Sequence, residues 1–234
     1  SKPSGCDSIT FLFVAQFPNL QGATQSQDDF DLYEYLGESW GIVFMHPGDF
    51  TPVCTTELGE AALRAEEFTK RGTKLCGFSC NDSDSHKGWI KDIEAVTNGE
   101  VKFPLFCDPN RDAAAKLGIL DENLKDAKGL PLTVRSVYII KPDKTIALMM
   151  TYPASTGRNF DEIIRVLDSL QLTANNSVAT PVNWKQGEDV IVNFPLSNAD
   201  ADEKFGKDGY RIVEVPSEAG KVLDKNYLRY TSAP

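Results

Sequence analysis

Residues 47–57 read Pro-Gly-Asp-Phe-Thr-Pro-Val-Cys-Thr-Thr-Glu, and this stretch decides how the surrounding chain is organised. The apolar run at 41–45 before it predicts a buried strand, and the apolar residues after it recur at helical spacing. Thr51 is a favoured N-cap and Pro52 suits the first helical position, so we expect Cys54 in the first helical turn. Unpaired backbone N–H groups and the helix dipole favour a thiolate there. The stretch therefore predicts a reactive cysteine, with a capped helix carrying a small buried cysteine as the alternative.

Strands and helices are expected to alternate on both sides of this stretch. Further apolar runs that predict strands lie at 9–17, 74–80, 103–107, 133–140 and 145–150. The last two are joined by the turn Lys-Pro-Asp-Lys and form a hairpin. Helices are expected after the caps at Asp82 and Asp108, and an amphipathic helix is expected from Phe160 to Leu170. This alternation around a hairpin indicates an α/β domain with a mixed sheet.

The composition changes near Leu172, where a polar connector at 173–182 begins. We therefore divide the chain into a main domain at 1–172 and a small extension at 173–234. About fifty residues form a weak independent core. The extension is expected to lean on the main domain or on a second subunit.

The overall composition excludes several function classes. A net charge of −10 argues against binding nucleic acid through a basic surface. No apolar run approaches the roughly 20 residues of a membrane helix, and no signal-peptide pattern is present at the N-terminus, so we expect a cytoplasmic protein without integral membrane association. The five cysteines, an odd number, suit free thiols in a reducing compartment. With two histidines and no Cys-x-x-Cys pair, we expect no metal and no prosthetic group.

The motif around the cysteine resembles a known family. Pro47, Thr51 and Cys54 stand in Pro-x-x-x-Thr-x-x-Cys spacing, inside the string Phe-Thr-Pro-Val-Cys-Thr-Thr-Glu, and this is similar to the active-site signature of the peroxiredoxins. Strings similar to the one-cysteine subfamily of peroxiredoxins continue at 132–135, 152–159, 178–184 and 225–230. The resemblance implies a thioredoxin-like fold with a mixed central sheet flanked by helices. It also implies that the C-terminal extension associates with the partner in a homodimer.

The resemblance further implies a thiol-dependent peroxidase that reduces hydrogen peroxide and organic or lipid hydroperoxides through a sulfenic acid on Cys54. In this family an arginine matching Arg135 holds the thiolate and orients the peroxide, a threonine matching Thr51 hydrogen-bonds the peroxide, and a proline matching Pro47 shields the sulfur. The sequence pattern alone leaves Arg135 equally compatible with an exposed position at a strand edge. Three further residues are expected to support the site: His46, Glu57 and Arg158.

The other cysteines bear on how the sulfenic acid is reduced. Two-cysteine peroxiredoxins carry a resolving cysteine in their C-terminal region, whereas this chain has no cysteine beyond Cys107. An external thiol is therefore expected, either glutathione or a thioredoxin-type protein. We expect Cys76 and Cys80 to pack in the core, and Cys6 to lie in a loose tail. Cys107 ends a strand, where it can be reactive, but the sequence shows no neighbour that would activate it, and we expect a buried thiol.

Two alternatives are a hydrolase and a peroxide-sensing scaffold that transmits oxidation to a partner with little turnover. Gly-x-Ser-x-Gly at 37–41 can form the nucleophile elbow of a hydrolase, but here the strand follows the motif, as in a turn that enters a strand. The motif also resembles a lipase-type string of one-cysteine peroxiredoxins, some of which are described as phospholipases A2. Ser39 and Asp143 match the proposed triad of that site. The histidine position holds Tyr33, whose phenol is a poor base near neutral pH.

Overall fold

The computed structural model describes residues 15–217 and 227–234. The chain divides into two compact units, Ser1–Phe160 and Asp161–Pro234. Within the described residues, no helix combines the length and the apolar character needed to cross a bilayer.

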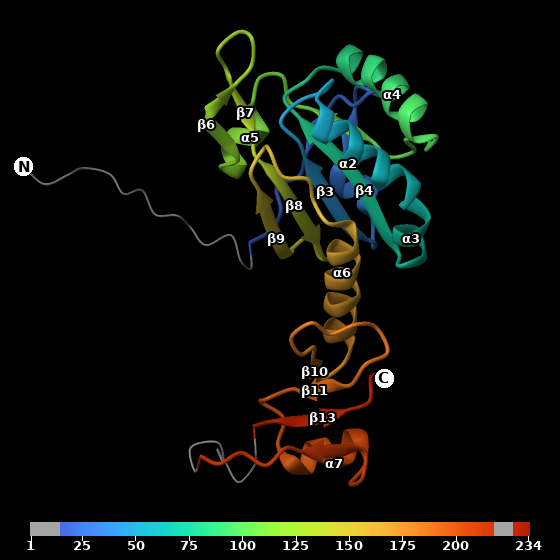
Figure 1. The fold of residues 1–234 in the computed structure, drawn as a ribbon, viewed down its shortest axis with the longest axis vertical. Helices are drawn as coiled ribbons and strands as arrows, with labels where there is room; N and C mark the ends of the chain where they lie inside the picture. Colours follow the sequence, from blue (N-terminus) through green and yellow to red (C-terminus); the bar gives the residue numbers. More distant parts are fainter. Residues whose placement is uncertain (1–14, 218–226) are drawn as a thin grey trace, which may run out of the picture. The chain divides into compact units, whose positions relative to one another are not determined.

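The first unit is built on a five-stranded mixed sheet in the order β5-β4-β3-β8-β9 (Figure 1). Its strands are β3 (Trp40–Met45), β4 (Thr73–Ser79), β5 (Leu105–Cys107), β8 (Arg135–Ile140) and β9 (Ile146–Tyr152). β3, β4 and β5 run parallel, β8 runs antiparallel to β3, and β9 runs antiparallel to β8. The mixed sheet and the predicted hairpin of β8 and β9 are confirmed. Because β3 is central, its apolar run at 41–45 is buried on both faces.

Helices and two small hairpins complete this unit. The helices are α1 (Leu32–Leu36), α2 (Pro52–Leu63), α3 (Ala65–Lys70), α4 (Ser83–Thr97) and α5 (Asp112–Leu117). The hairpins pair β1 (Gln21–Gly22) with β2 (Phe30–Asp31), and β6 (Leu120–Lys125) with β7 (Pro131–Thr133). Asp82 caps α4 by accepting from the backbone N–H of Ser85, as its position predicted. α4 packs against α2, and the Trp89 indole donates to the Thr55 hydroxyl across this contact at 3.0 Å.

A hydrophobic core holds the sheet and its surroundings together. Its larger buried members are Phe17, Leu20, Phe30, Met45, Phe78, Phe106, Tyr138 and Ile140. Phe17 packs edge-on against Tyr138, with ring centroids 5.1 Å apart. Cys76 is fully buried in this core and Cys80 packs against it, so their predicted packing role is confirmed. The four cysteines within the described residues are all free thiols.

The strand predicted at 9–17 lies mostly outside the described residues, as does Cys6. Its described end forms an isolated bridge between Gln16 and Thr145. The backbone N–H of Phe17 also donates to the carbonyl of Lys144, at 2.9 Å. These bonds fix the described end of this segment beside the turn between β8 and β9.

The second unit contains a four-stranded antiparallel sheet in the order β10-β11-β13-β12. Its elements are α6 (Phe160–Asn175, whose first residue belongs to the first unit), β10 (Val178–Ala179), β11 (Val190–Val192), α7 (Asn198–Phe205), β12 (Tyr210–Ile212) and β13 (Arg229–Thr231). Trp184, Val178 and Val190 form its small buried cluster. The domain boundary predicted at residue 172 lies within α6 and stays a prediction.

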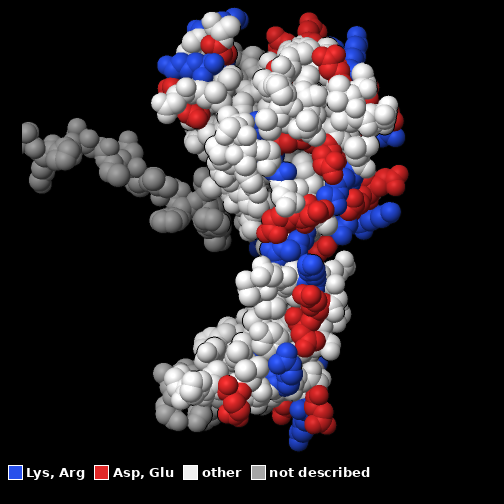
Figure 2. Space-filling view, in the orientation of Figure 1, with Lys and Arg blue, Asp and Glu red and all other residues white. Residues whose placement is uncertain are grey.

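Charged side chains of both signs are interspersed on the face of the molecule shown in Figure 2. Among the described residues, exposed pairs of opposite charge include Lys102 with Glu100 at 2.9 Å. Exposed pairs of this kind each contribute at most about 1 kcal/mol to stability. The described residues on this face form no extended basic surface of the kind that binds nucleic-acid phosphates.

Candidate active site

Cys54 is the third residue of α2, in its first turn. Thr51 occupies the N-cap with an extended backbone (φ −114°, ψ 144°), and Pro52 begins the helix, as predicted. The Thr51 hydroxyl does not cap the helix, because it donates to the carbonyl of Gly48 at 2.9 Å. Cys54 thus belongs to the first turn, whose backbone N–H groups have no partner within the helix and form the positive end of its dipole.

A buried arginine lies against this sulfur. Arg135 is the first residue of β8, and its Nη1 donates to Cys54 Sγ at 3.5 Å. Its Nη2 donates to the carbonyl of Ala154 at 2.8 Å, which fixes the plane of the guanidinium. Arg135 is only 2% exposed, so the alternative of an exposed strand-edge arginine is wrong. A cation at this distance favours the thiolate over the thiol.

Glu57 lies one turn after Cys54 and is paired with two arginines. Arg135 Nη1 donates to Glu57 Oε2, and Arg158 Nη2 donates to the same oxygen at 2.7 Å. The backbone N–H and the Nε of Arg158 donate to Glu57 Oε1 at 2.7 and 3.1 Å. A free carboxylate beside a thiol would disfavour the thiolate, but this one is neutralised by its partners. Glu57 therefore acts here as a clamp on both guanidinium groups.

Arg158 links this clamp to the sheet. Its Nη1 donates to the carbonyls of Met45 and Ser136, at 2.9 and 3.2 Å, and its guanidinium lies over the ring of Phe44. Burial lowers the pKa of Arg158, while Glu57 acts in the opposite direction. An arginine starts so far above neutral pH that it stays charged. We call Arg135, Glu57 and Arg158 the arginine cluster.

His46 belongs to a second buried group. Its Nε2 lies 3.1 Å from Asp49 Oδ1, and the other oxygen of Asp49 lies 2.8 Å from His86 Nδ1. Ser85 also donates its hydroxyl to Asp49, at 2.7 Å. Burial alone would raise the pKa of Asp49, but hydrogen bonds from the two histidines hold it well below its usual range. We call His46, Asp49 and His86 the histidine cluster.

The sequence reasoning named His46 and missed its two partners. Asp49 lies inside the motif, three residues after His46, and this spacing was the only available signal. His86 belongs to α4, and a position on a helix face says nothing about a contact with a loop nearly forty residues earlier.

The histidine cluster is also the group of described residues that comes closest to a metal site, since one ligand atom from each member lies within 4.8 Å of the others. Those nitrogen and oxygen atoms already hydrogen-bond to one another. His46 Nδ1 is buried without a partner among the described residues, but it is the second nitrogen of a ring whose Nε2 is engaged. These hydrogen bonds engage one nitrogen of each histidine with Asp49, and the predicted absence of a metal stays a prediction.

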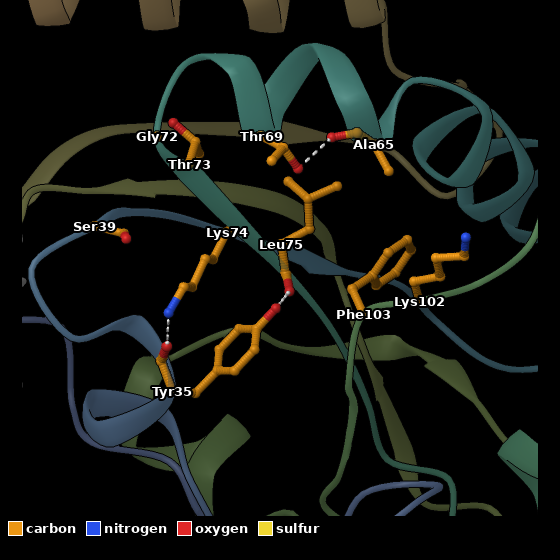
Figure 3. Close-up of a pocket in the computed structure, with 10 residues that line it drawn as sticks. All are labelled: Tyr35, Ser39, Ala65, Thr69, Gly72, Thr73, Lys74, Leu75, Lys102 and Phe103. Atoms are coloured by element: carbon orange, nitrogen blue, oxygen red, sulfur yellow. Dashed lines mark hydrogen bonds between the residues drawn. The ribbon is translucent and has the colours of Figure 1, made fainter.

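Ser39 lies elsewhere, beside a cavity of about 240 Å³ (Figure 3). The polar side chains of Lys74 and Tyr35, drawn near Ser39 in this figure, form hydrogen bonds to backbone carbonyls and not to Ser39. Lys74 donates to the carbonyl of Tyr35 at 2.6 Å, and the Tyr35 hydroxyl donates to the carbonyl of Leu75 at 3.0 Å. Burial raises the pKa of Tyr35, so its phenol does not serve as a base at neutral pH.

The other residues of the hydrolase hypothesis are also engaged. Thr145 donates from its backbone and its hydroxyl to Asp143 Oδ1, at 2.9 and 2.6 Å, and these bonds lower the pKa of Asp143. The Tyr33 hydroxyl donates to the carbonyl of Phe17. Across the described part of the chain, no hydrogen bond joins the Ser39 side chain to Tyr33 or Asp143. The structure adds no catalytic geometry to the hydrolase hypothesis, which stays a prediction.

Comparisons with known proteins agree over both units. Residues 14–149 match the AhpC/TSA family, and residues 169–207 match the C-terminal domain of 1-Cys peroxiredoxin. The chain is 52% identical to peroxiredoxin-6 of Rattus norvegicus over 206 residues, which cover 86% of this chain and 89% of the rat protein.

Two solved structures are similar as well. A cysteine-to-serine mutant of peroxiredoxin 6 from Arenicola marina is 42% identical with a TM-score of 0.88, and the match covers 95% of this chain and 98% of that one. A yeast mitochondrial 1-Cys peroxiredoxin is 39% identical with a TM-score of 0.81, over 94% of this chain and 98% of that one. The yeast structure concerns thiol resolution via the glutathione and thioredoxin systems.

Proposed function

Since the chain belongs to the 1-Cys peroxiredoxins of the AhpC/TSA family, and is therefore a thiol-specific peroxidase, we propose that Cys54 reduces hydrogen peroxide and organic or lipid hydroperoxides through a sulfenic acid. One observation carries the proposal. Arg135 Nη1 lies 3.5 Å from the sulfur of a cysteine in the first turn of a helix. Both features favour a thiolate, which is the nucleophile that a peroxide requires.

The reaction is a displacement at oxygen. The Cys54 thiolate attacks one peroxide oxygen, the O–O bond breaks, and the other oxygen leaves as hydroxide or alkoxide that takes a proton from water. The sulfur loses two electrons and becomes a sulfenic acid, while the peroxide is reduced to water or an alcohol. Arg135 and the N–H groups of the first turn of α2 stabilise the negative charge that develops on the leaving oxygen.

The loop before Cys54 is suited to position the peroxide. Pro47 is buried, which is compatible with the role that the family resemblance assigns to it, shielding the sulfur from water. The Thr51 hydroxyl donates to Gly48 at rest, and it has to exchange this bond for one to the peroxide. Thr51 is therefore expected to contribute to the reaction step rather than to the resting position of the sulfur.

An external thiol restores Cys54. The sulfenic acid condenses with the thiol, water leaves, and a mixed disulfide forms; a second thiol then attacks the disulfide and releases Cys54. Two observations support an external donor: the chain has no cysteine after Cys107, and the yeast relative works via glutathione and thioredoxin systems. Because Cys54 is fully buried, a small thiol such as glutathione reaches it more readily than a thioredoxin-type protein. Turnover with each reducing system in turn separates the two donors.

A homodimer is the proposed assembly. β9 is the last strand of the five-stranded sheet, and beyond its pairing with β8 its start is bonded to the segment at 15–16, where the Ile146 N–H donates to the carbonyl of Ala15 at 3.0 Å. Its half-buried apolar side chains include Leu148, Met149 and Met150. The last strand of a sheet is a site at which another chain can associate. Light scattering on the protein as it elutes from a size-exclusion column tests the homodimer. A mass equal to one chain at micromolar concentration would contradict the proposal.

Stopped-flow mixing of the pre-reduced protein with hydrogen peroxide tests the peroxidase assignment. We expect fast oxidation in the natural chain and none above the level of an ordinary thiol in Cys54→Ser. Mass spectrometry after one equivalent of peroxide should place a single oxygen on Cys54. A slow rate that Cys54→Ser leaves unchanged would sink the assignment. Sustained turnover with thiol donors separates an enzyme from a peroxide-sensing scaffold, which would be oxidised once.

A further inference from the structure

The loop at 46–51, between β3 and α2, carries both Pro47 and Thr51, and its backbone is strained at one position. Phe50 has a φ of 55°, which lies in the left-handed region that residues other than glycine rarely adopt. Its side chain is 58% exposed, so burial of the ring contributes little to holding this conformation. A strained residue persists only where its surroundings fix it. The neighbours of Phe50 therefore have to hold the turn.

Asp49, the residue before Phe50, is bonded to the start of α4 through its backbone and its side chain. Its Oδ2 lies 2.8 Å from His86 Nδ1 and accepts from the Ser85 hydroxyl at 2.7 Å. Its backbone N–H donates to Asn81 Oδ1 at 3.1 Å, and the Asn81 amide donates to the Ser85 hydroxyl at 3.1 Å. The start of α4 thus fixes the position of Asp49 in the loop.

The carboxylate of Asp49 is fully buried and accepts from three donors. Its lowered pKa keeps it ionised at neutral pH, and an ionised carboxylate can only accept hydrogen bonds. The ring nitrogens of His46 and His86 that face it are therefore both donors, like the hydroxyl of Ser85. Hydrogen bonds to a charged acceptor are about twice as strong as neutral ones. Asp49 is thus a strong fixed point inside an otherwise strained loop.

The position of Asp49 bears on the residues that meet the peroxide more directly than on the sulfur. The Thr51 hydroxyl donates to the carbonyl of Gly48, so the residues on either side of the pair Asp49 and Phe50 are tied together. Among the described residues, no hydrogen bond joins the Asp49 side chain to Cys54. The sulfur is contacted from β8 instead, by the guanidinium of Arg135. A displaced Asp49 would therefore move Thr51 and leave this contact in place.

We propose that Asp49 is a positioning residue for the peroxidase reaction. Held by His86 and Ser85, it fixes the loop at 46–51 so that Thr51 meets the incoming peroxide. This role rests on the peroxidase function proposed above, and it adds a determinant from α4 to the residues around Cys54. Asp49 then acts on the step with the peroxide and leaves the thiolate unchanged.

Two rates measured on the full, pre-reduced chain separate these effects. Stopped-flow mixing gives the rate with hydrogen peroxide, and mass spectrometry of the Cys54 peptide gives the rate of alkylation by iodoacetamide across pH. Alkylation requires the thiolate but no positioned peroxide. Asp49→Asn keeps the size of the side chain but replaces an acceptor oxygen with an NH₂ group. We expect its rate with hydrogen peroxide to fall about tenfold to a hundredfold, whereas the alkylation rate does not fall and its pH midpoint stays the same.

Asp108→Asn is the matched control, because Asp108 is also a buried aspartate directly after a strand of the sheet. It accepts from the backbone N–H groups of Ala113 and Ala114, and among the described residues none of its hydrogen bonds reaches the loop at 46–51. Both rates should equal those of the natural chain. A normal peroxide rate in Asp49→Asn, or a parallel fall of both of its rates, overturns the positioning role. A slow peroxide reaction in the natural chain would instead overturn the peroxidase function.

Ser85→Ala decides alone if circular dichroism shows that Asp49→Asn is unfolded. It removes one of the three donors to Asp49 and leaves both histidines in place. We expect the ratio of the peroxide rate to the alkylation rate to fall by about two- to tenfold. Asp82→Ala removes a bond to the backbone of Ser85 at the same helix start and should leave this ratio unchanged. An unchanged ratio in Ser85→Ala overturns the proposal.

Discussion

The arginine cluster and the histidine cluster lie at the same end of the strands of the central sheet. They differ in whether their cations lose a proton, and with it their charge, in the physiological pH range. Arg135 starts β8, His46 follows β3, and Cys107 ends β5, all at the carboxyl end of the parallel strands. Arginine stays protonated throughout the physiological range, whereas histidine titrates within it. The sulfur of Cys54 therefore lies beside a permanent charge, whereas the charge of the histidine cluster depends on pH.

The largest expected effect comes from Glu57→Gln, which leaves two buried guanidinium groups without a counter-charge. We expect the free energy of unfolding to fall by about 3–5 kcal/mol, measured by urea denaturation. Glu60→Gln is the matched control on the same helix, where the carboxylate is half exposed and 3.8 Å from Arg64. That change should cost less than about 1 kcal/mol. Equal losses in the two variants would mean that the arginine cluster contributes nothing special.

Removing the guanidinium beside the sulfur is the next largest change. Arg135→Met should lower the second-order rate with hydrogen peroxide by about 10²–10³, because the charge that stabilises the leaving oxygen is gone. Arg135→Lys keeps a positive charge, but an ammonium group cannot reproduce the bonds of the guanidinium to Cys54, Glu57 and Ala154 at the same time. Its rate with hydrogen peroxide should lie between that of the natural chain and that of Arg135→Met. Arg64→Met is the control, because Arg64 pairs with Glu67 after the end of α2 and takes no part in the arginine cluster. A normal rate in Arg135→Met contradicts the proposed mechanism.

A titration separates the two clusters directly. The pKa of His86 is raised from 6.5 to about 9, so its stabilising effect is complete below pH 6.5 and is lost as the pH rises through 9. The difference in unfolding free energy between the natural chain and His86→Asn should shrink by up to about 1.4 kcal/mol per pH unit across this window. The difference caused by Glu57→Gln should stay constant.

Burial lowers the pKa of His46, which gives the opposite sign: its protonation destabilises the fold as the pH falls below 6.5. The titration is therefore made between about pH 7.5 and 9.5, where His46 is mainly neutral in the folded and the unfolded chain. A constant difference for His86→Asn across this range would show that His86 does not carry the charge assigned to it.

The smallest effect is expected in the loop that joins the clusters. Thr51→Val removes the hydroxyl that donates to Gly48 and should cost about 1 kcal/mol, whereas Thr51→Ser keeps the bond. Asp82→Ala removes a true side-chain cap, that of α4, and should cost about the same. Only Thr51→Val should also slow peroxide reduction. Equal peroxide rates in Thr51→Val and Asp82→Ala would remove Thr51 from the reaction step.

Local chemistry explains what was predicted from the sequence. Neighbouring residues determine three features that were predicted correctly: the strand before Cys54, the N-cap at Thr51 and the helix start at Pro52. The short strands β6, β10 and β12 were not found. β10 and β12 have only two and three residues, and the mostly polar Leu-Asp-Glu-Asn-Leu-Lys of β6 shows no alternation of apolar and polar residues.

The residues of the site also fall into those that could be predicted and those whose role depends on contacts between distant elements. Resemblance to a family supplied Arg135 and Arg158, but sequence pattern alone left Arg135 between a buried and an exposed position, because its burial depends on Glu57 in another element. Asp49 and His86 meet only once α4 packs beside the loop after β3. The Thr51 hydroxyl turned to Gly48 because a nearby carbonyl competed with the helix N–H groups.

Arg158 donates hydrogen bonds to strand carbonyls that would otherwise accept from the backbone N–H groups of a neighbouring strand. The β3–β8 ladder ends at the pair Phe44 and Val137, and the next two carbonyls, of Met45 and Ser136, accept from Arg158 instead. The same side chain grips Glu57 on the helix that carries Cys54. Loosening this helix therefore releases two strand ends as well, and the reactive sulfur belongs to the same cooperative opening unit as the centre of the sheet. Its neighbouring amide protons should exchange with solvent as slowly as those of β3.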